Sequence, residues 1–260
     1  MADWGAGTYE LTAAQLAPVA AEVVDAAEPV SGLKTLDLAC GTGNAALLEA
    51  ERGAIVTGFD AATRLLEVAA GRAAEAGVEA TWVEGDMQDM PFADDSFEVI
   101  TSVFGVIFGD PQKVAAEVAR VLETNGRIAF TTWTNEGVLP RISALSSRAV
   151  AEAFNQDPAA GPMAFQWGND TDLNELFAEH GIAIQTEKKQ IVFTADSAEA
   201  ANEEFREHHP MWLALRETLG DEKFDALSTE VFEELKNSNE STDGGFSYSS
   251  TYLLAVGSPV

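Results

Sequence analysis

The stretch Leu36-Asp37-Leu38-Ala39-Cys40-Gly41-Thr42-Gly43-Asn44-Ala45-Ala46 decides the fold, because a short apolar strand runs into a Gly-x-Gly turn and then into a helix. Gly41 and Gly43 have no side chain, so the backbone can turn sharply there and a ligand can lie against it. Ala46 lets the helix pack close to the sheet. Dinucleotide-binding proteins share this pattern, and Asp60 follows Gly41 by nineteen positions, as their fingerprint expects. The turn alone therefore predicts a ligand site without identifying the ligand.

Carboxylates near the ends of three successive predicted strands separate the possible ligands. Asp37 lies in the strand before the turn, Asp60 ends the second strand and Asp86 follows the third. A dinucleotide would place an anionic pyrophosphate at the turn, which favours helix N–H groups without a neighbouring carboxylate. S-adenosylmethionine (SAM) has no phosphate and offers an ammonium and a sulfonium. Asp60 could accept both ribose hydroxyls and Asp86 an adenine amino group, so the three carboxylates favour SAM in the crevice where open α/β sheets bind ligands.

Short apolar runs alternate with helical patterns through the first half of the chain. The stretches Ala62–Ala76 and Gln112–Glu123 each carry apolar residues on one helical face. This alternation predicts a doubly wound α/β fold, a parallel sheet with right-handed crossovers and helices on both faces. The predicted strands are Thr35–Ala39, Ile55–Phe59, Ala80–Glu84, Phe97–Val103 and Ile128–Trp133.

The second half is mostly helical, with two late strands predicted at Gln190–Phe193 and Tyr252–Val256. We expect a single domain over residues 1–260, with a helical cover formed by residues 1–30. Two helical insertions are expected to form a lid that binds the substrate. The insertion candidates are residues 134–185 and 197–245.

The composition is that of an acidic globular protein. The 260 residues include 15 Lys and Arg against 43 Asp and Glu, a formal net charge of −28 that is shared evenly by both halves. Such a surface repels phosphate backbones and anionic membranes, so we expect a small-molecule partner, with no nucleic acid and no membrane. A single cysteine excludes a multi-thiolate zinc site, and we expect no metal. Met1–Tyr9 lacks Lys and Arg, and Leu11–Ala21 is too short to span a bilayer, so we expect a cytoplasmic protein.

Further motifs follow the glycine turn in order. They are Gly58-Phe59-Asp60, Gly85-Asp86-Met87 with Met90–Ile100, Asp110-Pro111, and Arg120-Val121-Leu122-x-x-x-Gly126-Arg127. Together with Leu36–Gly43 they resemble the class I SAM-dependent methyltransferases over about residues 34–134. The resemblance is strongest to the small-molecule type that is similar to the ubiquinone-biosynthesis methyltransferases. It implies a seven-stranded, mostly parallel sheet with strand order 3-2-1-4-5-7-6 and an antiparallel last strand.

The resemblance also assigns cofactor-binding residues. Backbone groups of Ala39 and Gly41 would hold the methionine end of SAM with Asp37 behind them, and Asp60 would bind the ribose. The other assignments are Gly43 in the turn, Ala61 against the adenine, Asp86 and Met87 at the adenine edge, Ser102 and Val103 with a carbonyl for the ammonium, and Trp4 and Tyr9 in a segment that folds over the cofactor.

The acceptor side carries weaker signals. Several members of the resembled family have a polar residue after the fourth strand, whereas this chain has the apolar run Phe104-Gly105-Val106-Ile107-Phe108, which favours a pocket wall over a general base. His208 and His209 are the candidate bases, with packing or surface exposure as the alternative. Candidate acceptor-binding residues, several of which could instead belong to the core, are Phe104, Trp133, Phe165, Trp167 and Trp212.

We therefore predict a SAM-dependent methyltransferase that acts on a small, partly apolar metabolite by in-line displacement. Such a transfer mainly needs alignment and exclusion of water, so the lack of an evident acid–base pair does not exclude catalysis. Two alternatives stay open. They are an NAD-dependent oxidoreductase and a SAM-binding protein without transferase activity. No motif encodes the acceptor atom, whether oxygen, nitrogen or carbon, or the oligomeric state.

Overall fold

Seven strands form one sheet in the computed structural model, which describes residues 3–29, 31–156, 167–242 and 244–260. The strand order is β3-β2-β1-β4-β5-β7-β6, and β7 is antiparallel to both of its neighbours, which confirms the expected order and the antiparallel last strand. The strands are β1 Lys34–Leu38, β2 Ile55–Asp60, β3 Ala80–Glu84, β4 Phe97–Val103, β5 Leu122–Gly137, β6 Ile182–Ala195 and β7 Phe246–Pro259.

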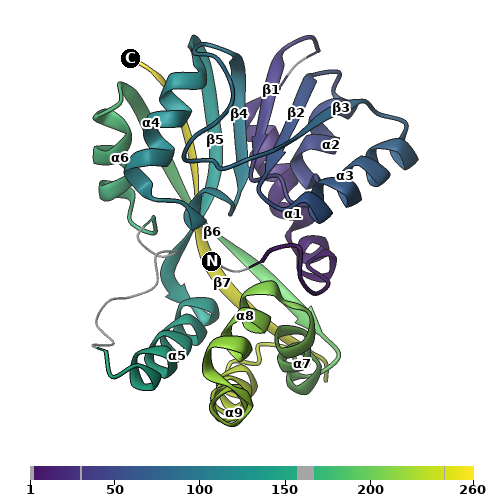
Figure 1. The fold of residues 1–260 in the computed structure, drawn as a ribbon, viewed down its shortest axis with the longest axis vertical. Coiled ribbons are helices and arrows are strands. Elements are labelled where there is room, and N and C mark those ends of the chain that lie inside the picture. Colours follow the sequence, from purple (N-terminus) through teal and green to yellow (C-terminus); the bar gives the residue numbers. More distant parts are fainter. Residues whose placement is uncertain (1–2, 30, 157–166, 243) are drawn as a thin grey trace.

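Helices cover both faces of this sheet (Figure 1). Helices α1, α2 and α3 pack side by side on one face, and α4 and α6 lie together on the other. The apolar stripe expected in α4 faces the sheet, because Val114, Val118 and Val121 are all buried. The bounds are α1 Glu10–Ala27, α2 Asn44–Glu51, α3 Thr63–Ala76, α4 Pro111–Val121, α6 Asp170–Ala178 and the short 3₁₀ helix η1 Val106–Phe108.

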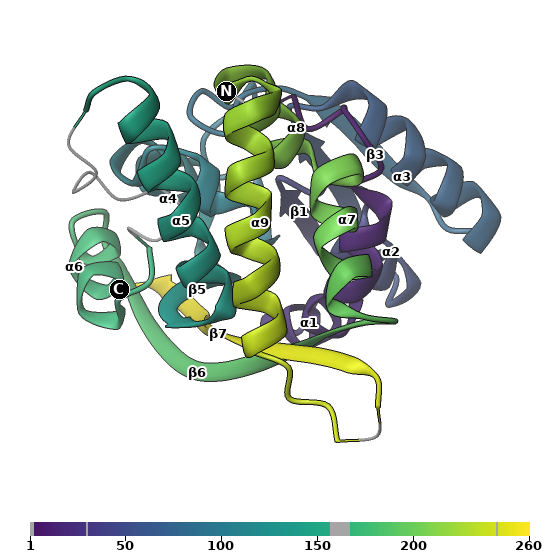
Figure 2. The ribbon, with the colours of Figure 1, turned by 90° about the horizontal axis from the view of Figure 1, so that it is seen from below.

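Four further helices form a second layer beyond the carboxyl ends of the parallel strands (Figures 1 and 2). Helices α5, α7 and α8 all pack against α9 or against one another. The β6–β7 pair stays in register from Ile182 opposite Pro259 to Ala195 opposite Phe246, so this long ribbon reaches from the sheet into the second layer. The bounds are α5 Val138–Ala153, α7 Ala198–His208, α8 Pro210–Leu219 and α9 Asp221–Asn237.

The sixth strand begins earlier than the sequence led us to expect. The expected strand was Gln190–Phe193, whereas β6 starts at Ile182, so the end of the expected insertion 134–185 belongs to the sheet. Helix α6 likewise packs on β6. β6 is an edge strand, and the exposed consecutive residues Glu187 and Lys188 place charged side chains on both of its faces. Because solvent reaches this part of β6, its sequence lacks the continuous apolar run that would predict a buried strand.

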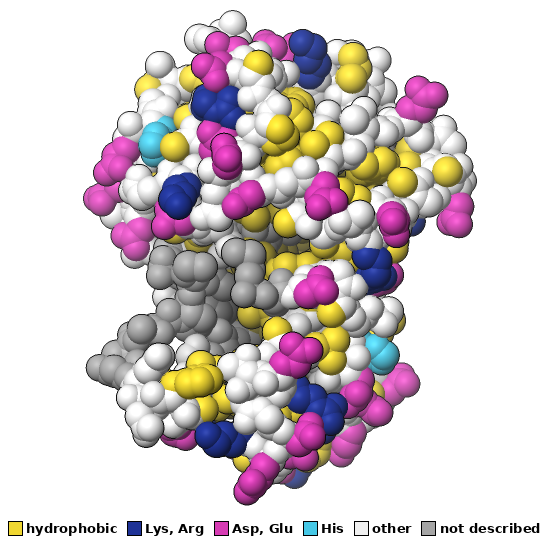
Figure 3. Space-filling model, in the orientation of Figure 1, with side chains coloured by type: hydrophobic (Ala, Val, Ile, Leu, Met, Phe, Trp, Pro, Cys, Tyr) yellow, Lys and Arg dark blue, Asp and Glu magenta, His cyan; other side chains and the backbone are white. Residues whose placement is uncertain are grey.

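The surface is acidic over both layers, and hydrophobic side chains show in the crease between them (Figure 3). Among the helices that the structure describes, none is both long and apolar enough to cross a membrane. The crease lies at the carboxyl ends of the parallel strands, where open α/β sheets bind their ligands.

Candidate active site

The backbone turns sharply at the glycine turn, as Gly41 and Gly43 predict. Ala39, Gly41 and Gly43 all have positive φ, at +55°, +52° and +80°. Gly43 is the N-cap residue of α2, and a Cβ there would lie 2.8 Å from Cδ1 of Leu47 and 3.0 Å from Cη2 of Trp82. Only glycine therefore allows α2 to start this close to its neighbours.

Asp60, at the end of β2, is held in place by this turn. Its Oδ2 accepts the N–H of Gly41 at 2.8 Å, and its Oδ1 accepts the N–H of Ala62 at 2.8 Å. Burial raises the pKa of Asp60, and these backbone donors oppose the rise. Each carboxylate oxygen can accept a second hydrogen bond, so Asp60 offers two fixed acceptor positions for a pair of hydroxyl groups.

A cavity of about 400 Å³ lies beside Asp60. It brings together nine of the residues assigned to the cofactor from the sequence, which are Trp4, Tyr9, Ala39, Gly41, Asp60, Ala61, Asp86, Met87 and Val103. Glu84, the last residue of β3, also lines it and was missed, although its place directly before Gly85-Asp86 was a usable signal.

The charge of this cavity suits a cation. Among the described residues its lining includes the carboxylates of Asp60, Glu84 and Asp86 and no Lys or Arg. A pyrophosphate would find no positive partner here, whereas the sulfonium and ammonium of SAM carry the complementary charge. The residues present therefore fit SAM.

Three other residues assigned to the cofactor do not line the cavity and instead support it. Gly43 permits the close packing described above. The buried carboxylate of Asp37 accepts the N–H of Ala46 at 2.9 Å, at the positive end of the α2 dipole, and Asp37 lines only a recess of about 20 Å³ behind the turn. The hydroxyl of Ser102 donates to the Leu38 carbonyl at 2.7 Å and so joins β4 to β1.

A second buried carboxylate, Glu49 of α2, lies near Asp37. The hydroxyl of Thr101 donates to Oε1 of Glu49 at 2.6 Å, but Oε2 has no hydrogen-bond partner among the described residues. Burial raises the pKa of Glu49 to about 7, and burial together with the charge of Glu49 raises the pKa of Asp37. The support beneath the glycine turn thus holds two carboxyl groups that resist ionisation.

We expect Glu49→Gln to remove part of the pH dependence of stability. In the unfolded chain Glu49 loses its proton near pH 4.5, as an ordinary glutamate does. In the folded protein it keeps that proton to about pH 7. The raised pKa of Glu49 therefore contributes up to about 3 kcal/mol to the free energy of unfolding below pH 4.5. This contribution is lost as the pH rises to 7. Urea unfolding at pH 5 and pH 8 should show the variant gaining on the wild type at the higher pH. Glu75→Gln on the exposed side of α3 should gain nothing, and equal differences at both pH values would contradict the prediction.

The N-terminal segment, residues 3–9, lies over the cavity and is held on both sides by hydrogen bonds. Nε of Arg64 donates to the Gly5 carbonyl at 2.6 Å, and its two terminal nitrogens bind Glu10 at 2.7 and 3.0 Å. On the other side the Thr8 N–H donates to the His208 carbonyl at 2.9 Å, and Nδ1 of His208 lies 3.3 Å from the Thr8 hydroxyl. His208 therefore fastens the segment and does not line either large cavity.

We expect Arg64→Ala to raise the KM for SAM about 3- to 10-fold with little change in kcat, because it loosens the cover without touching the ligand. Steady-state kinetics with varied SAM tests this. Arg127→Ala is the matched control, since Arg127 holds the Glu28 carbonyl at the far end of α1. An equal change of KM in both variants would show that general loosening of α1 causes the effect.

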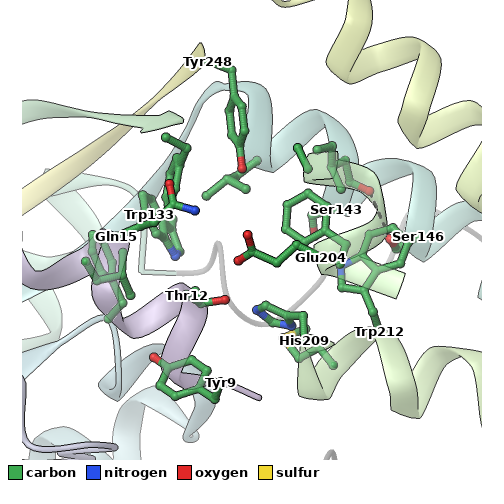
Figure 4. A pocket seen from close by; sticks show the side chains of 18 of the residues that line it. Tyr9, Thr12, Gln15, Trp133, Ser143, Ser146, Glu204, His209, Trp212 and Tyr248 are labelled. Atoms are coloured by element: carbon green, nitrogen blue, oxygen red, sulfur yellow. Dashed lines mark hydrogen bonds between the residues drawn. The ribbon is translucent and has the colours of Figure 1, made fainter. Parts of the chain in front are cut away.

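A second cavity, of about 180 Å³, adjoins the first (Figure 4). Trp4, Tyr9, Phe104 and Phe108 line both cavities. Five more aromatic residues line the second cavity, which are Trp133, Phe193, Phe205, Trp212 and Tyr248. The structure thus brings three of the assigned acceptor-binding residues, Phe104, Trp133 and Trp212, to one apolar chamber beside the first cavity.

Phe104 forms the partition between the two cavities. Its φ is +55°, its N–H donates to the Thr131 hydroxyl at 3.0 Å, and its ring stacks on Trp133 with 3.8 Å between centroids. Gly105 follows it, and a Cβ there would collide with Cβ of Ala39. The partition is therefore pressed against the glycine turn.

The structure places one assigned acceptor-binding residue elsewhere. Trp167 is wrongly placed by the sequence, because its side chain is 1% exposed and packs on Phe130 and Phe177 away from the cavity. Its carbonyl accepts the Thr132 hydroxyl at 2.9 Å. Phe165 lies outside the described residues.

A few polar groups face the second cavity. His209 reaches it, and its Nδ1 is buried without a hydrogen-bond partner among the described residues. Burial lowers the pKa of His209 to about 4, so the imidazole is neutral at pH 7. Glu204 of α7 also points inward, near Thr12 of α1 (Figure 4), and the sequence did not single it out. In the described part of the chain no three His, Cys, Asp or Glu side chains are grouped to hold a metal ion.

The comparisons with known proteins agree with this geometry. Residues 35–126 match the family model described as a methyltransferase domain. Uncharacterized protein Rv1405c of Mycobacterium tuberculosis is 31% identical over 221 residues, which cover 84% of this chain and 79% of that protein. Nocamycin O-methyltransferase of Saccharothrix syringae is 38% identical over 132 residues, 48% of this chain and 47% of that enzyme. The crystal structure of YcgJ from Bacillus subtilis superposes with a TM-score of 0.63 at 21% identity and covers 92% of this chain and 96% of that one.

The fold and the site define a methyltransferase with a Rossmann-like sheet. The chain belongs to the class I SAM-dependent methyltransferase family, and its cofactor is SAM. Family membership rejects the NAD-dependent oxidoreductase, whereas a measurement of methyl transfer separates an enzyme from a SAM-binding protein without transferase activity.

Proposed function

We propose that this methyltransferase transfers the methyl group of SAM to a small, largely apolar metabolite held in the aromatic cavity. The observation that carries the proposal is the shared wall, because Phe104 and Phe108 line both cavities. An acceptor in the aromatic cavity and a donor beside Asp60 would meet at this wall.

We assign the protein groups as follows. Asp60 binds the ribose, Asp86 and the Met87 backbone bind the adenine edge, and backbone groups of Ala39 and Gly41 hold the methionine end. SAM supplies a methyl group on a positively charged sulfur. The chain then has to align an acceptor with that methyl group and keep water away.

We propose that helices α5, α7, α8 and α9 act as the lid over the acceptor, within one domain. The support is that residues of α5, α7 and α8 line the aromatic cavity, including Ile142, Glu204 and Trp212. Aromatic walls exclude water and bind apolar surface, which favours a metabolite with an apolar body.

Transfer of isotope-labelled methyl groups from SAM to a panel of small metabolites tests the proposal. We expect labelled product with apolar or aromatic acceptors and none with sugars or nucleotides. A chirally labelled methyl group should be transferred with inversion, as in-line displacement requires. Retention would reject the displacement step, and labelling of polar acceptors only would reject the assigned acceptor class.

A further inference from the structure

The acceptor cavity combines aromatic walls with a single carboxylate. Nine aromatic side chains line it, and among its described lining residues Glu204 is the one acidic residue, with no Lys or Arg. A carboxylate that faces an apolar chamber with no Lys or Arg in its lining is costly unless the ligand supplies the charge. Aromatic faces attract organic cations and add to this preference.

The side chain of Glu204 points into the chamber and lies between two other elements. It projects from α7 between Thr12 of α1 and Tyr248 of β7 (Figure 4). Burial raises the pKa of Glu204, while the charge of His208 and a hydrogen bond with Thr12 oppose the rise. The charge of Glu204 in turn adds to the burial that raises the pKa of Tyr248. His209, which is neutral, adds no competing positive charge.

The carboxylate also lies near the wall that the two cavities share. Tyr9 lines both, and Thr12 follows it by one helical turn, so the two side chains share a face of α1. A ligand group that is bound at Glu204 beside Thr12 is therefore close to the side of the chamber where the methyl donor would lie.

We propose that the acceptor is a small amine with an aromatic or aliphatic body, that it binds as its ammonium ion paired with Glu204, and that Glu204 accepts its proton. This inference rests on the proposed function of the two cavities. In the transfer, a proton leaves the nitrogen for a Glu204 oxygen and frees a lone pair. The nitrogen then forms a bond with the methyl carbon as the carbon–sulfur bond breaks, and that electron pair stays on the sulfur. The product is a methylated ammonium ion, a neutral thioether and a protonated Glu204.

Anionic acceptors are excluded by the same lining. A carboxylate or phosphate group in this chamber would meet Glu204 and no described Lys or Arg. The net charge of −28 further concentrates cations around the protein and repels anions.

Calorimetry with matched probes tests the inference in protein saturated with S-adenosylhomocysteine. The probes are the ammonium ions of benzylamine, phenethylamine and tryptamine. Each is compared with an alcohol and a carboxylate that carry the same aromatic group. We expect at least one ammonium to bind about 10-fold or more tightly than its alcohol, and no carboxylate to bind. Glu204→Gln should lose this preference but still bind the alcohol. Glu203→Gln, on the exposed side of the same helix, should keep it.

Several results would overturn the inference. They are no ammonium binding more tightly than its alcohol, a carboxylate binding best, or Glu204→Gln keeping the preference. The wild-type series decides the question even if that variant fails to fold. Labelled transfer to alcohols or carbon acceptors without ammonium binding would reject the amine and leave the proposed function intact. Failure of S-adenosylhomocysteine to bind would instead count against the proposed donor site.

Discussion

Asp60→Ala should lower the affinity for SAM and for S-adenosylhomocysteine by at least about 100-fold. The variant removes two acceptor positions that are held by the N–H groups of Gly41 and Ala62, each at 2.8 Å. A hydrogen bond to a charged acceptor contributes about 1.5–3 kcal/mol, so losing two gives an effect of this size. Isothermal titration calorimetry measures it directly.

The same variant also frees two backbone N–H groups, so its fold must be checked by circular dichroism and thermal unfolding. Asp60→Asn keeps one acceptor oxygen and should fall between the wild type and Asp60→Ala. Glu75→Ala on α3 removes an exposed carboxylate and should bind normally. Near-normal binding by a folded Asp60→Ala protein would show that the ribose lies elsewhere.

Gly105→Ala should abolish most of the activity. The added Cβ would collide with Cβ of Ala39 and lie 3.0 Å from both the Ala39 carbonyl oxygen and the Ser102 hydroxyl. Ala39 belongs to the glycine turn and cannot give way easily, so the end of β4 and the Phe104 partition must shift. Such overpacking costs about 1–3 kcal/mol of stability and displaces both ligand sites. Methyl transfer and urea unfolding measure the two effects.

Gly71→Ala provides the matched control for that change. Gly71 lies within α3, and a Cβ there would meet nothing within 4 Å. The control should stabilise the protein by about 0.5–1 kcal/mol and leave activity unchanged. Gly105→Ala with full activity and unchanged stability would mean that the turn is more compliant than its contacts indicate.

The residues that line the first cavity could be predicted well, because local rules govern where they lie. A turn that needs positive φ selects glycine, as at Gly41, and carboxylates that follow successive parallel strands must converge at one edge. Asp37 shows the limit of this reasoning. Its position in the strand was readable, but only the structure shows that it caps α2 from behind the turn.

The residues of the aromatic cavity were harder to predict, because its lining depends on which way neighbouring side chains point. His208 and His209 are adjacent in sequence, yet one fastens the N-terminal segment and the other faces the cavity. Trp167 is a residue type that often lines pockets, but its side chain is buried in the core. Glu204 lies among other acidic residues of α7 and looks like part of a solvated surface until the fold places it opposite Thr12. These features arise from tertiary packing.

The wall that both cavities share makes the two binding equilibria interdependent. Trp4, Tyr9, Phe104 and Phe108 contribute to each compartment, so a ligand that orders these rings in one compartment changes the free energy of filling the other. Thermodynamic linkage then requires reciprocity. If the thioether product raises the affinity for the acceptor tenfold, the acceptor must raise the affinity for that product by the same factor. If this coupling is positive, we expect the acceptor to inhibit at high concentration, because it would stabilise a ternary complex with the product.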